Sequence, residues 1–215
     1  MKSLQKFGGL AAFYLALAHL TGIIVFIVIL DYINITDLAQ KVSVNVANQS
    51  VVFSTNLLMY VFFGFFLIVL LLALYDRLKS GAPAMMKVAA AIGIIWAGSL
   101  IASGMVANAG LAAIVPLYAK DPAQAALTWQ GIEVVTGGLG NANGEILGGM
   151  MTLLVSIAAL RSKGLPKALN ILGLVVGGIG ILTIVPVLNN LVAVFGVSQI
   201  IWFTWIGIVL LRSTN

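Results

Sequence analysis

The stretch TGGLGNANGEILGGMMTLLVSIAAL, from Thr136 to Leu160, joins two unlike parts. Up to Gly149 it holds six glycines, two asparagines and a glutamate, and an apolar run then continues to Arg161. A helix of about 20 residues is needed to cross a hydrocarbon core of about 30 Å. To reach that length before Arg161, the helix must begin near Asn141. The stretch therefore predicts a membrane-spanning helix whose first turns carry glycine, asparagine and one carboxylate.

The composition of the whole chain supports a membrane location. Of 215 residues, 61% are hydrophobic and the mean hydropathy is +1.14. The 11 Lys and Arg plus 6 Asp and Glu give 17 formal charges, too few to cover the surface of a soluble protein of this size. Since lipid leaves no water for unpaired backbone groups, helices are expected throughout. The sequence predicts one all-α, polytopic transmembrane domain over residues 1–215.

Apolar runs separated by polar or Gly/Pro punctuation divide the chain into six predicted transmembrane helices. They cover about residues 8–30, 51–75, 84–107, 141–160, 167–186 and 191–211. With the N-terminus inside, nine of the 11 basic residues fall on inner segments and only Lys41 and Lys120 on outer ones. This bias is the positive-inside pattern, so both termini are expected to be cytoplasmic.

The predicted outer loop between the third and fourth helices contains KDPAQAALTWQGIEVV. Asp121 is a suitable helix N-cap and Pro122 a suitable first helical residue. Because Trp129 lies among alanine and leucine, we expect a short amphipathic helix on the outer membrane surface. An ordinary solvated loop helix is the alternative.

Glycines at four-residue spacing indicate close contact between helices. If the fourth helix began near Asn141, Gly140, Gly144 and Gly148 would form one smooth stripe of the small-xxx-small kind. Gly173 and Gly177 repeat the spacing on the fifth helix. A phosphate loop is excluded because no strand precedes the glycines.

Two ionisable residues fall inside the predicted spans. Glu145 is expected about 6 Å below the outer end of the fourth helix, and His19 about 16 Å from the inner end of the first. The axial gap of roughly 8 Å is too long for a hydrogen bond between them. The sequence places Thr152, Gln199 and Thr204 nearer to His19 in depth, so they are its better expected partners. Three readings of His19 stay open: a neutral histidine bonded across a helix interface, a proton-relay or ligand-binding group, and a metal or haem ligand.

Polar side chains gather near the outer ends of the predicted helices. Besides Glu145, these are Asn56, Asn108, Asn141, Asn143, Asn189 and Asn190, with Gln199 deeper in the sixth helix. They predict a wet vestibule that opens outward and is covered by the 120–135 segment. Helix ends are polar in most membrane proteins, which is the alternative explanation.

Three segments carry a resemblance: KFGGLAAFYLALAHLTGI (6–23), LALYDRLK (72–79) and LRSKGLPKALNILGLVVGGIGIL (160–182). They resemble the bacterial six-helix integral membrane family catalogued as domain of unknown function 4386. The resemblance implies a six-span protein of the bacterial cytoplasmic membrane and assigns no activity or catalytic residue.

The function that the sequence favours is association: an accessory or structural subunit of a larger membrane assembly. No paired carboxylates, serine triad or metal-ligand cluster is present in the sequence, so no enzyme activity is expected. The expected partners are membrane lipids and other membrane protein subunits; neither nucleic acid nor a cofactor is expected, apart from bound lipids. The alternative is a small proton-linked transporter, or a binder of a lipid or quinone, that uses the outward-facing vestibule with Glu145 and His19.

Overall fold

The computed structural model describes residues 2–140 and 145–212, and within them the fold is all-α. In chain order the elements are α1 (Lys2–Gly22), η1 (Ile23–Ile29), η2 (Tyr32–Asn34), α2 (Leu38–Ala47), α3 (Gln49–Asn56), η3 (Leu57–Phe62), α4 (Phe63–Leu78), α5 (Pro83–Tyr118), α6 (Pro122–Leu139), α7 (Ile146–Ser162), α8 (Lys167–Leu182), η4 (Pro186–Leu188) and α9 (Leu191–Arg212).

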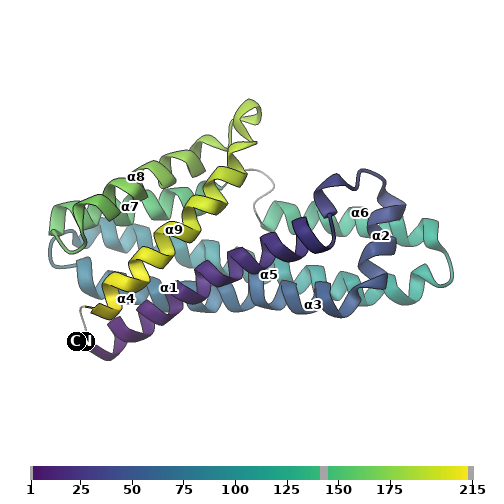
Figure 1. Cartoon of the computed structure of the whole chain (residues 1–215), viewed down its shortest axis with the longest axis horizontal. Helices are drawn as coiled ribbons and strands as arrows, with labels where there is room; N and C mark the ends of the chain where they lie inside the picture. The colour runs from purple at the N-terminus through teal and green to yellow at the C-terminus, as the bar shows by residue number, and fades with distance from the viewer. Residues whose placement is uncertain (1, 141–144, 213–215) are drawn as a thin grey trace.

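Three long rods run along the molecule. The π-helical η1 continues α1, and the π-helical η3 joins α3 to α4, so that each rod is one unbroken helical segment. The third rod is α5, whose 36 residues span about 54 Å at 1.5 Å per residue. These rods connect the two ends of the molecule, which are built from different helices. At one end α7, α8 and α9 pack against the rods, and at the other lie α2 and α6 (Figure 1).

Glycines bring several helix backbones into direct contact. A Cβ at Gly149 would lie 2.8 Å from the backbone nitrogen of Ile181 and 2.9 Å from the carbonyl oxygen of Gly177, which joins α7 to α8. A Cβ at Gly9 would lie 3.2 Å from the carbonyl oxygen of Gly207, which joins the start of α1 to the end of α9. Small residues at these points let the bundle close without side chains between the backbones.

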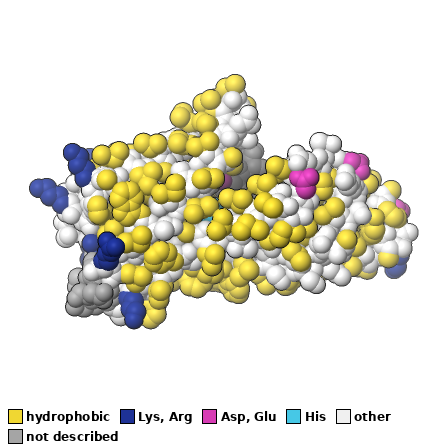
Figure 2. Space-filling model, in the orientation of Figure 1, with side chains coloured by type: hydrophobic (Ala, Val, Ile, Leu, Met, Phe, Trp, Pro, Cys, Tyr) yellow, Lys and Arg dark blue, Asp and Glu magenta, His cyan; other side chains and the backbone are white. Residues whose placement is uncertain are grey.

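The helices have the length and composition of a membrane protein. Among the described residues, four segments are long and apolar enough to cross a membrane: Ser3–Ile29, Gln49–Leu78, Pro83–Tyr118 and Leu191–Arg212. The apolar α7 and α8 are shorter, with 17 and 16 residues. Figure 2 shows lysine and arginine gathered at the end of the molecule where α1 begins and α9 ends, and acidic side chains near the opposite end. The chain is therefore that of an α-helical membrane protein.

The structure differs from the sequence prediction at several points. The third predicted span was expected to end near residue 107, but α5 continues to Tyr118, with Pro116 inside its last turns. The fifth was expected to reach residue 186, but α8 ends at Leu182. The first outer loop contains a helix of its own, α2, capped by Asp37. The fourth predicted span does not begin near Asn141: Glu145 is the non-helical N-cap and α7 begins at Ile146.

The predicted start of α6 is confirmed. The Asp121 carboxylate accepts a hydrogen bond of 3.0 Å from the backbone N–H of Gln124, and Pro122 is in the first turn. The 18-residue helix packs along the C-terminal half of α5, where a Cβ on Gly110 would lie 2.7 Å from the Ile132 side chain. A position of α6 on the membrane surface stays a prediction.

Candidate functional site

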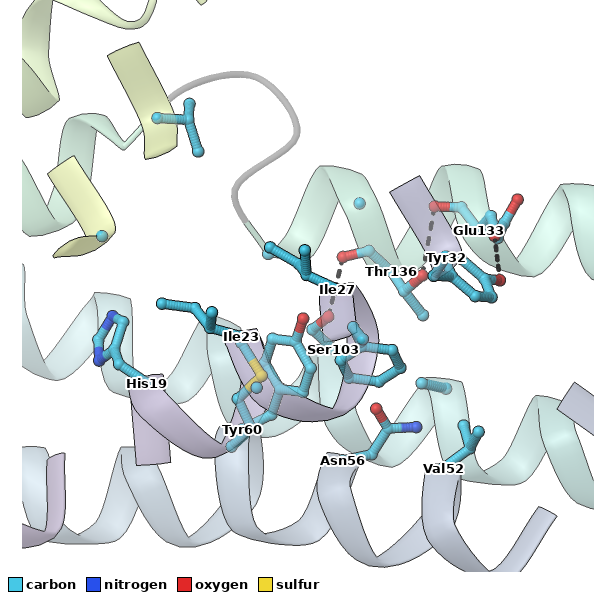
Figure 3. A pocket seen from close by; sticks show the side chains of 18 of the residues that line it. His19, Ile23, Ile27, Tyr32, Val52, Asn56, Tyr60, Ser103, Glu133 and Thr136 are labelled. Atoms are coloured by element: carbon cyan, nitrogen blue, oxygen red, sulfur yellow. Dashed lines mark hydrogen bonds between the residues drawn. The ribbon is translucent and has the colours of Figure 1, made fainter. Parts of the chain in front are cut away.

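A cavity of about 720 Å³ lies where the two ends of the molecule meet. Its walls come from the end of α1 and η1, from α3 and η3, from the middle of α5, from α6 and from the start of α9 (Figure 3). Known ligand pockets have volumes of roughly 300–1,000 Å³ and combine an apolar lining with a few polar groups. The cavity meets both criteria, since residues such as Ile23, Ile27 and Val197 share its surface with His19 and Glu145.

Both π-helical segments face this cavity. From η1, Ile23, Phe26 and Ile27 line it, and from η3, Met59 and Tyr60 do. A π-helix has an extra residue in each turn, which changes the direction of the side chains relative to the α-helix that continues it. Such segments are frequent at functional sites, and here both of them line the same cavity.

Glu145 reaches the cavity from the start of α7. Its backbone N–H donates a hydrogen bond of 2.7 Å to the Thr183 hydroxyl, and that hydroxyl donates one of 2.6 Å to the Gly180 carbonyl at the end of α8. The Glu145 side chain does not cap its own helix. The residue is 7% exposed, and its Oε2 atom is buried with no hydrogen-bond partner among the described residues. Burial of a carboxyl oxygen without a hydrogen-bond partner costs free energy. A ligand group that pairs with this oxygen would therefore be stabilised in the cavity.

The second carboxylate of the cavity, Glu133 on α6, is paired. The Tyr32 hydroxyl donates a hydrogen bond of 2.8 Å to Glu133 Oε1, and the Lys41 Nζ lies 3.8 Å from Oε2. Tyr32 in turn accepts hydrogen bonds from Asn45 Nδ2 at 3.1 Å and from Trp129 Nε1 at 3.2 Å. This network ties η2 and α2 to α6 and forms one end of the cavity (Figure 3).

Burial and the adjacent carboxylate keep the Tyr32 phenol neutral. Burial is the main cause that raises the pKa of Tyr32 above its ordinary value of 10.0, and Glu133 raises it further, although the Asn45 hydrogen bond acts in the opposite direction. A neutral phenol donates to Glu133 and accepts from both neighbours at the same time. The network is therefore fully formed at neutral pH.

Two serines of α5 hold the end of α6 at the cavity. Ser103 Oγ donates a hydrogen bond of 2.8 Å to the Thr136 carbonyl, and Ser99 Oγ donates to the Leu139 carbonyl. The last carbonyls of a helix have no partner within it, so the Ser99 hydroxyl satisfies the Leu139 carbonyl. The Thr136 carbonyl also accepts a hydrogen bond of 2.7 Å from the Gly140 N–H, so Ser103 adds a second bond there. Since residues four apart share one face of a helix, the Ser99–Ser103 pair places the last turn of α6 against a single face of α5.

His19 lies at the opposite end of the cavity from Tyr32 and Glu133 (Figure 3). Its Nδ1 is 3.1 Å from the Leu15 carbonyl oxygen, and because a carbonyl only accepts, Nδ1 carries the proton. The ring packs edge-on against Phe63, with centroids 5.0 Å apart, and lies 6.0 Å from the Phe203 ring. The expectation that Thr152, Gln199 or Thr204 would partner His19 is wrong, because the histidine bonds within its own helix.

Of the polar residues that the sequence grouped together, only some line the cavity. His19 and Glu145 both line the cavity, with no hydrogen bond between them among the described residues. Asn108 lies behind the lining, where it accepts a hydrogen bond of 3.0 Å from Asn56. Gln199 is fully buried and donates to Thr152 at 2.8 Å, which joins α9 to α7. Asn141 and Asn143 lie outside the described residues.

The glycines that were predicted to pack helices fall into two groups. Gly148 contacts Trp96 and Phe195, while Gly173 contacts Ser156 and Gly177 contacts the backbone of Leu153. Gly140 instead follows the last residue of α6 as its C-cap, and Gly144 lies outside the described residues. The expected single stripe through Gly140 and Gly148 is wrong because the chain is not helical at Glu145.

The contacts of the Tyr32 network were not predicted from the sequence. On α6, Trp129, Glu133 and Thr136 are spaced by four and three residues, so they share the helix face that lines the cavity. That spacing could have been read from the sequence. Tyr32 and Asn45 gave no such signal, because their position depends on how the 31–48 segment folds back over α6.

The comparisons with known proteins return no match: no protein-family model, no curated protein and no solved structure is significantly similar to this chain. The resemblance to the six-helix family stays a prediction. Within residues 2–140 and 145–212, no group of three or more His, Cys, Asp or Glu residues is placed to hold a metal ion. The fold and site define an α-helical membrane protein with a largely apolar cavity, into which Glu145 brings a buried carboxyl oxygen that has no hydrogen-bond partner among the described residues.

Proposed function

We propose that this protein binds a small amphipathic molecule in the cavity between α6 and the helix bundle. The observation that carries the proposal is the cavity itself: about 720 Å³, with apolar walls and polar groups at separate points of its surface. Two of the polar residues that the sequence predicted around a vestibule, Asn56 and Glu145, line it, and α6 forms one wall of it. We therefore favour ligand binding over a purely structural role.

Two glycines provide a matched test of this proposal. Gly196 on α9 lines the cavity, and a Cβ there would meet nothing within 4 Å. Gly178 on α8 is equally open but lies away from the cavity. Gly196→Trp should fill the cavity with little backbone strain, whereas Gly178→Trp should leave it empty.

The readout is binding of a neutral fluorescent probe, N-phenyl-1-naphthylamine, to the protein in nanodiscs, corrected for empty nanodiscs. The proposal predicts saturable binding to wild type and Gly178→Trp, and at least about tenfold weaker binding to Gly196→Trp, equal to about 1.4 kcal/mol. Equal binding by both variants, or no saturable signal from wild type, would refute it.

The proposed topology has six membrane crossings with both termini in the cytoplasm. In addition to the four long segments, α7 and α8 would cross, since they are apolar, pack in the same bundle and span about 26 and 24 Å. The C-terminal part of α5 would then extend beyond the outer surface with α2 and α6. The clustering of basic side chains at the end where α1 begins supports this direction.

The absence of cysteine from the sequence makes this topology testable by single-cysteine labelling. Ser80, Lys167 and Asn189 are exposed positions in or beside three different turns. In intact cells of a bacterial host, a membrane-impermeant maleimide should label Asn189→Cys and spare Ser80→Cys and Lys167→Cys until the cells are opened. Labelling of Lys167→Cys in intact cells would contradict a crossing by α7 and α8.

A second candidate function is association with a larger membrane assembly. The turn between α8 and α9 projects from the bundle (Figure 1), and its apolar residues Ile184, Val185 and Val187 are 49%, 40% and 82% exposed. Such a patch is suited to contact with another protein or with lipid. Extraction in mild detergent followed by native mass measurement would test this: a stable complex lost in Val187→Asp supports it, and a partner-free wild-type particle contradicts it.

A further inference from the structure

We infer that the cavity takes an amphipathic cation, whose positive group is held by Glu145. This inference rests on the proposed function and specifies the class of ligand. The observation behind it is the contrast between the two acidic side chains of the cavity: Glu133 is paired with Tyr32 and Lys41, while the Oε2 atom of Glu145 is buried with no hydrogen-bond partner in the part of the chain that the structure describes.

The charges around the cavity have one sign. Among its described lining residues the titratable groups are Glu133, Glu145, His19, Tyr32 and Tyr60, and there is no lysine or arginine. Lys41 is the nearby cation, and it faces Glu133 rather than Glu145. Residues 141–144 are Asn, Ala, Asn and Gly, which add no charge by sequence. An anionic ligand would meet the Glu145 carboxyl group and no lysine or arginine among the described lining residues, since the nearby Lys41 is already paired with Glu133. The electrostatics therefore favour a cation.

Aromatic rings add to the attraction for a cation. Phe26, Tyr32, Tyr60 and Trp129 line the cavity. The face of an aromatic ring attracts a positive group, more strongly where water is excluded. Apolar positions such as Ile23, Ile27 and Val197 offer contact for the hydrocarbon part of the same ligand. A single positive group on an apolar body would therefore satisfy the Glu145 carboxylate and the apolar lining together.

The experiment compares three amphiphiles with one tail: decyltrimethylammonium, decanol and decyl sulfate. Each is titrated against N-phenyl-1-naphthylamine bound to the protein in nanodiscs, with empty nanodiscs as the blank for partition into lipid. On wild type, the cation should displace the probe at a concentration at least about tenfold below that of decanol, and decyl sulfate should be the weakest of the three. Burial disfavours the ionised form of Glu145 in the empty cavity, and a bound cation would favour it. Glu145→Gln cannot ionise and changes the shape little, so it should bring the cation and decanol to within about twofold of each other.

Asp76→Asn is the control, because it removes a carboxylate that lies near the end of α4, outside the cavity, where it pairs with Lys79. It should keep the cation preference of wild type. Probe binding that persists in Glu145→Gln shows that the variant is folded and its cavity intact. If the cation and decanol displace the probe equally from wild type, or if Glu145→Gln keeps the wild-type preference, the inference is wrong and the proposed function stands. If the neutral probe does not bind wild type at all, the proposed function fails and the inference fails with it.

Discussion

The backbone N–H of Glu145 donates a hydrogen bond of 2.7 Å to the hydroxyl of Thr183, across the gap between the start of α7 and the end of α8. Thr183 is fully buried, and its hydroxyl is held by the Gly180 carbonyl. The bond fixes the backbone of Glu145 at its non-helical position, while the carboxylate is left to face the cavity. Thr183 is thus a positioning residue for the carboxylate that we propose to bind the ligand.

Two substitutions of Thr183 should distinguish its role in positioning Glu145 from its role in packing. Thr183→Val keeps the side-chain shape and removes the acceptor, which leaves a buried N–H unpaired at a cost of about 1–3 kcal/mol. The preference for decyltrimethylammonium over decanol should fall in Thr183→Val and be kept in Thr183→Ser, while both variants still bind the neutral probe. A preference that is unchanged in Thr183→Val would show that this bond does not position Glu145.

Two glycines of the α7–α8 pair should respond to alanine with opposite signs. Gly149→Ala places a Cβ 2.8 Å from the Ile181 nitrogen, so the helices must separate, at a cost of about 1–3 kcal/mol. Gly178→Ala meets nothing within 4 Å and should stabilise α8 by up to about 1 kcal/mol through helix propensity. Thermal unfolding midpoints in one detergent measure both changes. A destabilised Gly178→Ala or an unaffected Gly149→Ala would contradict the described packing.

The Asn56–Asn108 pair should show strong coupling in a double-mutant cycle. The two side chains are 4% and 7% exposed, and the Asn56 amide donates to the Asn108 oxygen at 3.0 Å, joining α3 to α5. Asn56→Leu or Asn108→Leu alone leaves a buried polar group unpaired, and the double variant removes both. We expect the double variant to lose less stability than the sum of the single losses, by about 0.5–3 kcal/mol. Additive losses would mean that the pair does not interact.

The Tyr32 network should make stability fall in strong alkali. Because burial raises the pKa of Tyr32 above 10.0, the unfolded chain loses this proton before the folded chain does as the pH rises. The stabilisation is therefore fully present below pH 10 and is lost progressively above it. Wild type should lose stability more steeply than Tyr32→Phe between about pH 10 and 11.5 in chemical unfolding. Parallel curves for the two proteins would indicate that the phenol is not buried as described.

Helix positions were largely predictable from the sequence, because apolar runs and their punctuation are local signals. The Asp121–Pro122 start of α6 was confirmed for this reason. The start of α7 was predicted too early, since the length rule for a membrane span demanded helix before Ile146, while Glu145 takes a non-helical conformation held by Thr183. That bond joins residues 38 positions apart and has no local signature.

The candidate site was predictable in part. A buried carboxylate and a histidine within apolar runs were visible as unusual residues, and both line the cavity. The partner of His19 was predicted wrongly, because axial depth alone ignores the carbonyl one turn earlier in the same helix. The Tyr32 contacts to Trp129 and Glu133 span 97 and 101 positions and depend on the folding of η2 and α2 over α6. The π-helical geometry of η1 and η3 was equally invisible, since their residues are those of ordinary apolar helices.

The location of a bound probe tests the central claim most directly. Wild-type protein would be crystallised with decyltrimethylammonium carrying a terminal iodine, and the iodine located by its anomalous scattering. We predict a peak inside the cavity, in contact with side chains of η1, η3 or α9, that is absent from Gly196→Trp crystals grown in the same way. A peak confined to the lipid-facing surface of the bundle, or an equal peak in the filled variant, would contradict the account.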